Sequence, residues 1–207
     1  MDLPIEVPGL DTIVPVLEQS TILVVEGGPD LAKSFFVRRL CRTAAHAGLP
    51  VTFLTSRDAQ DIGERFANEN GGADGARMEI VERDTVKELG SDVPRGGLLA
   101  VDSFSFLALD LTPNELARLL RDVRRDCLAK GSNVVLTTDA GMFDPRAEAV
   151  VTHLGEGLIA FHAQEGNEGI VRFLRIPKWA DGRFVDRNIY YEFDGRRIAI
   201  DLRNRVL

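Results

Sequence analysis

One short stretch carries the residues best suited to chemistry, and it reads Gly27-Gly28-Pro29-Asp30-Leu31-Ala32-Lys33-Ser34. A glycine followed six residues later by Lys-Ser matches the outline of a phosphate-binding loop, in which backbone N–H groups surround the phosphates of a nucleotide. In such a loop Lys33 would contact the β- and γ-phosphates, and the Ser34 hydroxyl would bind Mg²⁺. The stretch is therefore predicted to bind ATP, with Ser34 as a magnesium ligand.

Two residues of this loop weaken the match. Ala32 stands where the motif has its second glycine, so a methyl group lies where backbone and ligand come close. Asp30 adds a carboxylate, which at about 5 Å from a phosphate charge would cost roughly 3 kcal/mol at an effective dielectric constant near 20. ATP binding is therefore predicted to be weak or lost. The alternative is an ordinary strand, turn and helix with a chance Lys-Ser pair.

The loop needs a strand before it and a helix after it, and the sequence provides both. Residues 22–25 form a short run of branched apolar residues, typical of a buried parallel strand. Apolar residues then recur at helical spacing, which predicts a helix over about 31–47 that ends at Gly48. Strand, glycine turn and helix are the setting that a phosphate-binding loop requires.

A second candidate residue follows another buried strand. Residues 98–101 are apolar, and Asp102 comes directly after them. In open α/β sheets ligands bind at the carboxyl ends of the strands. Asp102 is therefore predicted to act at the magnesium ion together with Ser34. The alternative is that Asp102 caps the turn after its strand.

The remaining chain first alternates strands and helices and then consists of strands alone. Further strands are predicted over 51–55, 78–82 and 133–137, with helices that begin near Asp58 and at the capping box of Thr112 and Glu115. Late strands are predicted over 158–163, 171–177, 185–193 and 196–200, the last two joined by a two-residue turn at Asp194-Gly195. These elements predict an α/β fold with a mostly parallel central sheet flanked by helices, extended by C-terminal antiparallel strands.

The bulk composition limits the classes of function. We expect a single domain over residues 1–207, in which residues 1–20 form an N-terminal segment with a turn at 8–11 and a short helix ending near Leu17. The net charge of −7 makes nucleic-acid binding unlikely. The absence of an apolar run near 20 residues predicts no membrane span. Cys41 and Cys127 fall on apolar helix faces, as expected of reduced core residues in a cytoplasmic protein.

Taken in order, these stretches resemble the RecA-type P-loop ATPases, and within them the KaiC-like branch, which includes RadA-type recombinases and the archaellum protein FlaH. The stretches that carry the resemblance are 8–11, 26–34, 56–62, 98–103, 152–159, 175–178 and 194–198. It implies a RecA-type fold, ATP with Mg²⁺ at the loop, and a nucleotide between neighbouring subunits of an oligomer. It also implies that Lys178 supplies charge to a neighbouring subunit's phosphates.

The chain departs from that family where catalysis depends on it. The family usually carries one or two glutamates after its second strand, one of them the general base for water, whereas this chain has Ser56 and Arg57. Neither side chain accepts a proton near neutral pH, so we assign no catalytic residue. The late Lys-x-Arg element of the family reads Lys178-Trp179-Ala180 here.

The leading hypothesis is a degenerate KaiC-like P-loop protein that binds ATP weakly or no longer, hydrolyses little, and serves as a regulatory or assembly partner of an unknown protein. One alternative is a working signalling ATPase whose base is Glu26 or Glu64. Another is a DNA-binding recombinase paralogue. A homo-oligomer is also expected, with the turn at Lys178-Trp179 projecting outward as its anchor.

Overall fold

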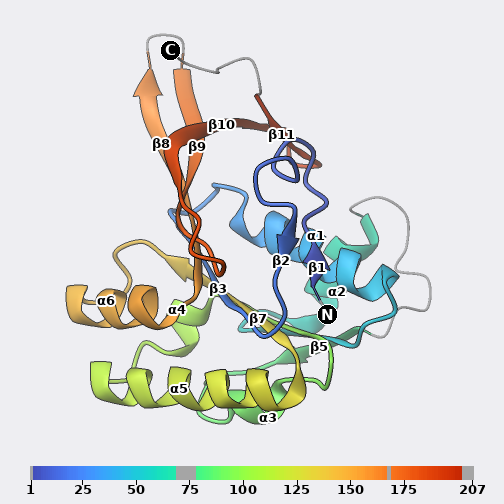
Figure 1. The fold of residues 1–207 in the computed structure, drawn as a ribbon, viewed down its shortest axis with the longest axis vertical. Coiled ribbons are helices and arrows are strands. Elements are labelled where there is room, and N and C mark those ends of the chain that lie inside the picture. The colour runs from blue at the N-terminus through green and yellow to red at the C-terminus, as the bar shows by residue number, and fades with distance from the viewer. Residues whose placement is uncertain (1, 69–77, 167–168, 202–207) are drawn as a thin grey trace.

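The computed structural model describes residues 2–68, 78–166 and 169–201. Within them the main sheet has nine strands in the order β11-β10-β9-β8-β3-β7-β6-β4-β5 (Figure 1). In chain order the strands are β3 (Ile22–Gly27), β4 (Val51–Thr55), β5 (Met78–Glu82), β6 (Leu98–Asp102), β7 (Asn133–Asp139), β8 (Gly157–Gly166), β9 (Gly169–Lys178), β10 (Val185–Phe193) and β11 (Ile198–Ile200). The glycine-rich stretch 70–75 lies outside the described residues.

The sheet changes from parallel to antiparallel at β8. β3 pairs in parallel with both β7 and β8, and β6 joins β7 to β4 in the same sense. β9, β10 and β11 then add as antiparallel neighbours. This confirms the α/β fold with a C-terminal antiparallel extension. Because the parallel strands share one direction, the loops after β3, β4, β6 and β7 gather at the same edge.

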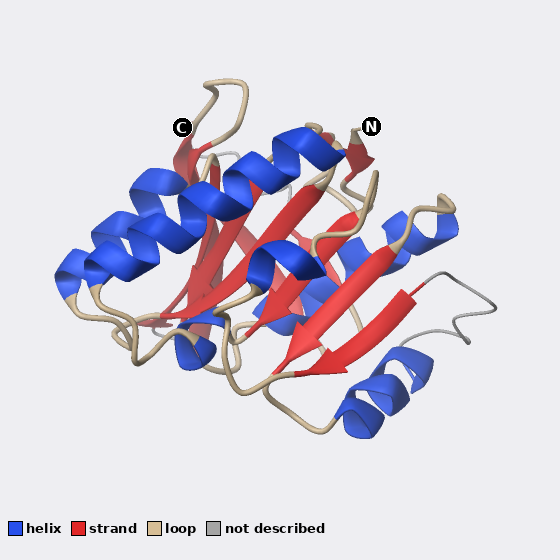
Figure 2. Cartoon of the chain, turned by 90° about the horizontal axis from the view of Figure 1, so that it is seen from below, coloured by secondary structure: helices blue, strands red, loops and turns tan. Residues whose placement is uncertain are grey.

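Helices cover both faces of the sheet (Figure 2). They are α1 (Lys33–His46), α2 (Ala59–Asn68), α3 (Leu89–Asp92), α4 (Phe104–Leu107), α5 (Pro113–Lys130) and α6 (Pro145–Leu154). Alternate residues of β3 enter the two cores: Leu23 packs in the core that holds α1 and α2, and Val24 in the core beneath α5 and α6. A strand buried on both faces explains why its sequence is continuously apolar.

Several helix ends follow their expected signals. Thr112 and Glu115 form the predicted capping box of α5, which ends at Gly131 with φ 65°. The Asp58 carboxylate accepts hydrogen bonds from the first N–H groups of α2. Helix α6 was not predicted from the sequence, although Asp144 and the following proline mark its start with an ordinary cap.

The N-terminal segment differs from its expectation. Instead of a short helix ending near Leu17, residues 3–4 and 16–17 pair as strands β1 (Leu3–Pro4) and β2 (Val16–Leu17), with turns between them. The apolar side chains of the segment are buried in the core beside α1. A Cβ placed on Gly9 would lie 2.7 Å from Ile200 Cβ, so this segment also meets the last strand closely.

Two further expectations about the late strands are wrong. Trp179 does not project outward: it is only 2% exposed, and its ring lies over Gly157 at the start of β8. The turn between β10 and β11 is longer than two residues, because Phe193 pairs with Ile198 and Asp194 caps the backbone of the intervening turn. Among the described residues, no helix has the length and apolarity to cross a membrane.

Candidate functional site

The predicted phosphate-binding loop connects β3 to α1 at the carboxyl edge of the sheet. Asp30 and Ala32 both adopt left-handed backbone conformations, with φ of 59° and 66°. A left-handed residue that carries a Cβ costs about 1–2 kcal/mol, and aspartate tolerates this region better than alanine does. Ala32 therefore keeps a backbone shape that glycine would adopt without strain. Gly27, at the end of β3, lies so close to Phe161 that a Cβ on Gly27 would be 2.6 Å from the carbonyl oxygen of Phe161.

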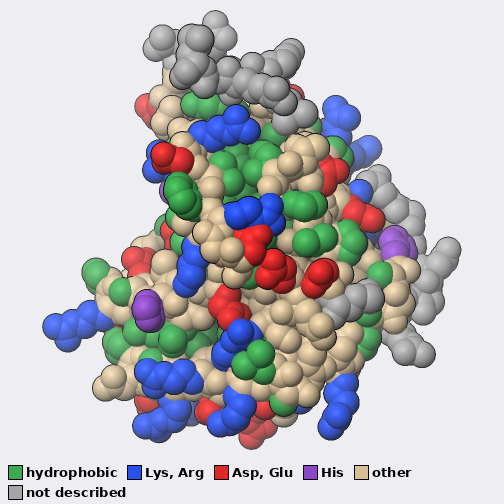
Figure 3. Space-filling view, in the orientation of Figure 1, with side chains coloured by type: hydrophobic (Ala, Val, Ile, Leu, Met, Phe, Trp, Pro, Cys, Tyr) green, Lys and Arg blue, Asp and Glu red, His purple; other side chains and the backbone are tan. Residues whose placement is uncertain are grey.

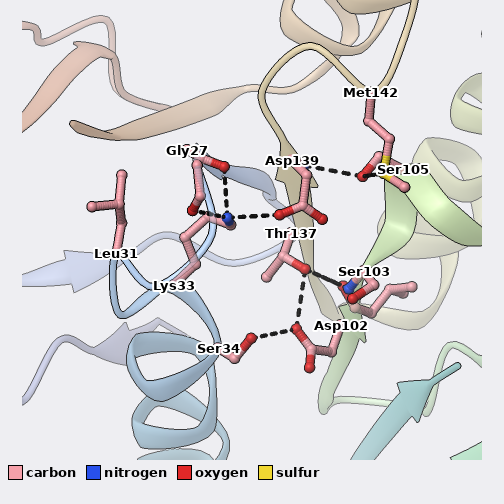
Figure 4. A network of polar contacts seen from close by, with 12 residues as sticks. Gly27, Leu31, Lys33, Ser34, Asp102, Ser103, Ser105, Thr137, Asp139 and Met142 are labelled. Atoms are coloured by element: carbon pink, nitrogen blue, oxygen red, sulfur yellow. Dashed lines mark hydrogen bonds and ion pairs between the residues drawn. The ribbon is translucent and has the colours of Figure 1, made fainter. Parts of the chain in front are cut away.

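Lys33 lies at the start of α1 and is almost entirely buried, with 7% exposure. Its Nζ donates to the carbonyl oxygens of Gly27 at 2.6 Å and Gly28 at 2.7 Å, and to Asp139 Oδ1 at 2.9 Å (Figure 4). An ammonium group has three N–H donors. All three are thus used inside the protein, and a phosphate would have to replace at least one of these acceptors.

A second polar cluster adjoins the lysine. Ser34 Oγ donates to Asp102 Oδ1 at 2.8 Å, and Thr137 Oγ1 donates to the same oxygen at 3.2 Å (Figure 4). The Ser103 N–H in turn donates to Thr137 Oγ1 at 2.6 Å. Hydroxyl and carboxylate oxygens are the ligands that Mg²⁺ prefers in proteins. The two residues predicted for magnesium therefore lie together, and their donor atoms fit that ion.

Both clusters open into a cavity of about 830 Å³. Besides the loop, it is lined by residues from α1, from the β4–α2 connection and α2, and from the turn between β10 and β11; those outside the loop include Phe35, Arg38, Arg57, Arg65, Phe193 and Arg196. The rings of Phe35 and Phe193 lie 5.3 Å apart. One cavity thus joins a phosphate-type loop, an apolar corner and several arginines.

Lys178 does not lie in this cavity. Its Nζ donates to the carbonyl oxygens of His153 and Gly155. In the sheet, Lys178 at the end of β9 pairs with Leu158 at the start of β8. The phosphate-binding loop begins at Gly27, the last residue of β3, and Gly27 pairs with Phe161 farther along β8. Within one chain, the structure therefore separates Lys178 from the other residues predicted to bind nucleotide.

The residues considered for proton abstraction lie in different places. Arg57 lines the cavity, whereas Glu26 and Glu64 are not among its lining residues. Glu26 lies beside Glu148 in a smaller space. Burial, and next the nearby charge of Glu148, raise the pKa of the Glu26 carboxyl above its ordinary value of 4.5. Of the described side chains that line the cavity, the carboxylates belong to Asp30, Asp102 and Asp139.

Asp139 is the main site residue that the sequence analysis missed. It ends β7, and Ser105 Oγ accepts a hydrogen bond from its backbone N–H at 3.0 Å. A weaker signal was available, because Asp139 ends a strand with apolar residues at 134–136, although two threonines come between them and the aspartate. The sequence gives no sign of the contact between Asp139 and Lys33, which are 106 residues apart in the chain.

Comparison with known proteins supports the fold. The chain superposes on the KaiC-like protein PH0186 from the hyperthermophilic archaeon Pyrococcus horikoshii OT3 with a TM-score of 0.78 and 20% identity, over 97% of this chain and 99% of the other. The chain has a KaiC/RecA-like fold. The flagellar accessory protein FlaH from Methanocaldococcus jannaschii gives the same TM-score at 14% identity, over 97% and 98% of the two chains. No protein-family model and no curated protein matched the sequence.

Proposed function

We propose that this chain is a KaiC-like P-loop protein that binds ATP weakly, hydrolyses it little, and acts as a regulatory or assembly partner of another protein. The observation that carries the proposal is the state of Lys33, whose three N–H donors are all engaged by Gly27, Gly28 and Asp139. A phosphate must compete with the Asp139 carboxylate for the lysine, and this competition lowers the affinity.

The residues that would receive the nucleotide have separable roles. The backbone of the loop would surround the phosphates, while Lys33 would contact them after releasing Asp139. Ser34 and Asp102 would hold Mg²⁺, which neutralises phosphate charge when bound. Ala32 maintains the left-handed turn before the helix at the cost of strain.

Slow hydrolysis follows from the groups near the end of β4. Thr55 is in register with Asp102, so Ser56 and Arg57 come directly after the strand beside the proposed magnesium site. A guanidinium group stays protonated and takes no proton from water. A partner role is supported by the lack of this base and by the description of FlaH, a similar fold, as an accessory protein.

Calorimetric titration with ATP and Mg²⁺, followed by phosphate release on the same sample, tests the proposal. We expect a dissociation constant no tighter than roughly 10 μM, about 7 kcal/mol of binding free energy or less. Turnover should stay below about 1 s⁻¹, because the missing base removes a factor of about 10²–10⁴. Lys33→Ala should abolish binding while its melting curve shows a folded protein. A nanomolar constant or rapid phosphate release would contradict the proposal.

A further inference from the structure

The cavity beside the loop has a charge opposite to that of the whole chain. Five basic and three acidic side chains are among its described lining residues, whereas the chain carries a net charge of −7. Basic and acidic side chains are intermixed over the face of the molecule drawn in Figure 3. Two of the three acids are engaged, Asp102 with Ser34 and Asp139 with Lys33. The positive balance therefore lies mainly with arginines, which favours an anionic ligand.

Three of these arginines contrast with the arginines that pair with acids elsewhere in the described chain. The guanidinium groups of Arg57, Arg65 and Arg196 have no hydrogen bond or ion pair with any described residue. Other arginines are paired with nearby acids: Arg83 with Asp92, Arg124 with Glu156, Arg183 with Asp181 and Arg197 with Asp194. Unpaired guanidinium groups that line a cavity keep their donors available for a ligand.

Arg57 and Arg65 share the wall formed by β4 and α2. Arg57 lies two residues after Thr55, and its backbone N–H donates to Thr55 Oγ1 at 3.1 Å. α2 is fixed by Phe66, whose ring packs edge-on against Phe53 and whose carbonyl accepts from Arg42. Arg65 is therefore carried by a packed helix, and Arg57 lies in the short connection before that helix, where its backbone is bonded to the end of β4.

The Arg57 end of this wall adjoins the cluster of Ser34 and Asp102. β4 is in register with β6, so Thr55 neighbours Asp102, and Asp102 in turn accepts from Ser34 of the loop. Arg57 comes two residues after Thr55 and lines the same cavity as Ser34 and Asp102. A guanidinium group there donates to phosphate oxygens through its planar fork of N–H groups.

We propose that Arg57 and Arg65 form a subsite for the terminal phosphate of a nucleoside triphosphate, so that the protein distinguishes a triphosphate from a diphosphate without cleaving it. The inference rests on the proposed function, because it needs a nucleotide on the loop. The two arginines retain the terminal phosphate, and neither takes a proton from water. The chain then reports which nucleotide is present through the occupancy of this wall.

Titration of the full chain with ATP, ADP and tripolyphosphate tests the subsite. The double variant Arg57→Gln/Arg65→Gln removes both charges, and Arg118→Gln/Arg121→Gln on α5 removes the same charge away from the cavity. We expect the wild type to bind ATP about tenfold or more tightly than ADP. In the cavity variant, the affinities for ATP and tripolyphosphate should fall by about tenfold, while the affinity for ADP should change by less than about threefold. This variant should therefore no longer distinguish ATP from ADP. The control variant should keep it.

The outcomes separate this inference from the proposed function. Equal binding of ATP and ADP by the wild type, or an unchanged ATP preference in the cavity variant, would overturn the subsite while leaving weak nucleotide binding intact. Tripolyphosphate binding that depends on the arginines but is unaffected by Lys33→Ala would support the subsite and contradict the proposed role of the loop. Failure of the wild type to bind any of the three ligands at millimolar concentration would overturn both.

Discussion

The buried lysine and two exposed arginines of the same cavity differ in whether their N–H donors are already engaged. Lys33 is buried and its three donors end on acceptors of its own chain, whereas Arg57 and Arg65 reach the same cavity from exposed positions with no described partner. The lysine thus stabilises the fold first and binds a ligand only in exchange. The number of cations around a cavity therefore overstates the number of N–H donors that are ready for a phosphate.

The largest effect expected from this contrast is on stability. Lys33→Ala should lower the free energy of unfolding by roughly 2–3 kcal/mol, because it leaves two carbonyl groups and the partly exposed Asp139 carboxylate without their cation. Arg57→Ala should change it by no more than about 0.5 kcal/mol. Urea denaturation of both variants measures the difference. Equal losses would mean that the lysine contributes no more to the fold than the arginine does.

A second experiment tests the competition between Asp139 and phosphate. Asp139→Asn removes the ion pair but keeps an acceptor beside Lys33, so the affinity for ATP should rise about tenfold, or about 1.4 kcal/mol. Asp122→Asn on the exposed face of α5 changes the net charge equally and should leave the affinity unchanged. Calorimetric titration compares the two. An unchanged or weaker affinity in Asp139→Asn would remove the competition from the explanation.

A smaller effect should come from the strained turn of the loop. Ala32→Gly removes a left-handed strain of about 1–2 kcal/mol but adds about 0.4–1 kcal/mol of unfolded-chain entropy, which leaves a net gain of roughly 0.5 kcal/mol. Ala44→Gly, inside the α1 helix that follows the loop, should instead lower the free energy of unfolding by about 1 kcal/mol. Chemical denaturation of both variants shows whether the free energy of unfolding rises or falls in each. A destabilised Ala32→Gly would show that the turn is not strained.

The smallest expected effect concerns Glu26 and depends on pH. Because the folded protein raises the pKa of this carboxyl above 4.5, ionisation costs stability at neutral pH and costs nothing once both states are protonated. Glu26→Gln should therefore raise Tm at pH 7, and the gain should disappear as the pH falls below 4.5. Thermal melts at several pH values, with Glu64→Gln as the exposed control, measure it. A gain that persists in acid would contradict the stated cause.

Local sequence signals predicted much of the parallel half of the sheet and of the loop. The strands before Gly27 and Asp102 were predictable because a strand buried on both faces has a continuous apolar sequence that ends abruptly at a polar residue. The contact of Ser34 with Asp102 followed from the rule that ligand-binding residues gather at the carboxyl edge. These features depend on patterns within a few residues.

The features that could not be predicted depend on contacts between distant residues. Asp139 is a visible strand end, but nothing near it in sequence shows that it neutralises Lys33. Trp179 follows a strand like a residue of an exposed turn, yet it packs inward because the N-terminal segment supplies the covering surface, including Ile13 and Val14. That Arg57 has no partner among the described residues likewise depends on which acids the fold places near it.

The packing of an early segment against late strands has a consequence for the order of folding. Ile13 and Val14 share an apolar pocket with Ile176, Trp179 and Val185, so they complete their packing against residues that are synthesised much later. On the ribosome, the side of Ile13 and Val14 that faces this pocket therefore stays uncovered until the late strands have emerged. Contacts of such long sequence separation form slowly, and apolar side chains that wait for them are open to aggregation or to a chaperone.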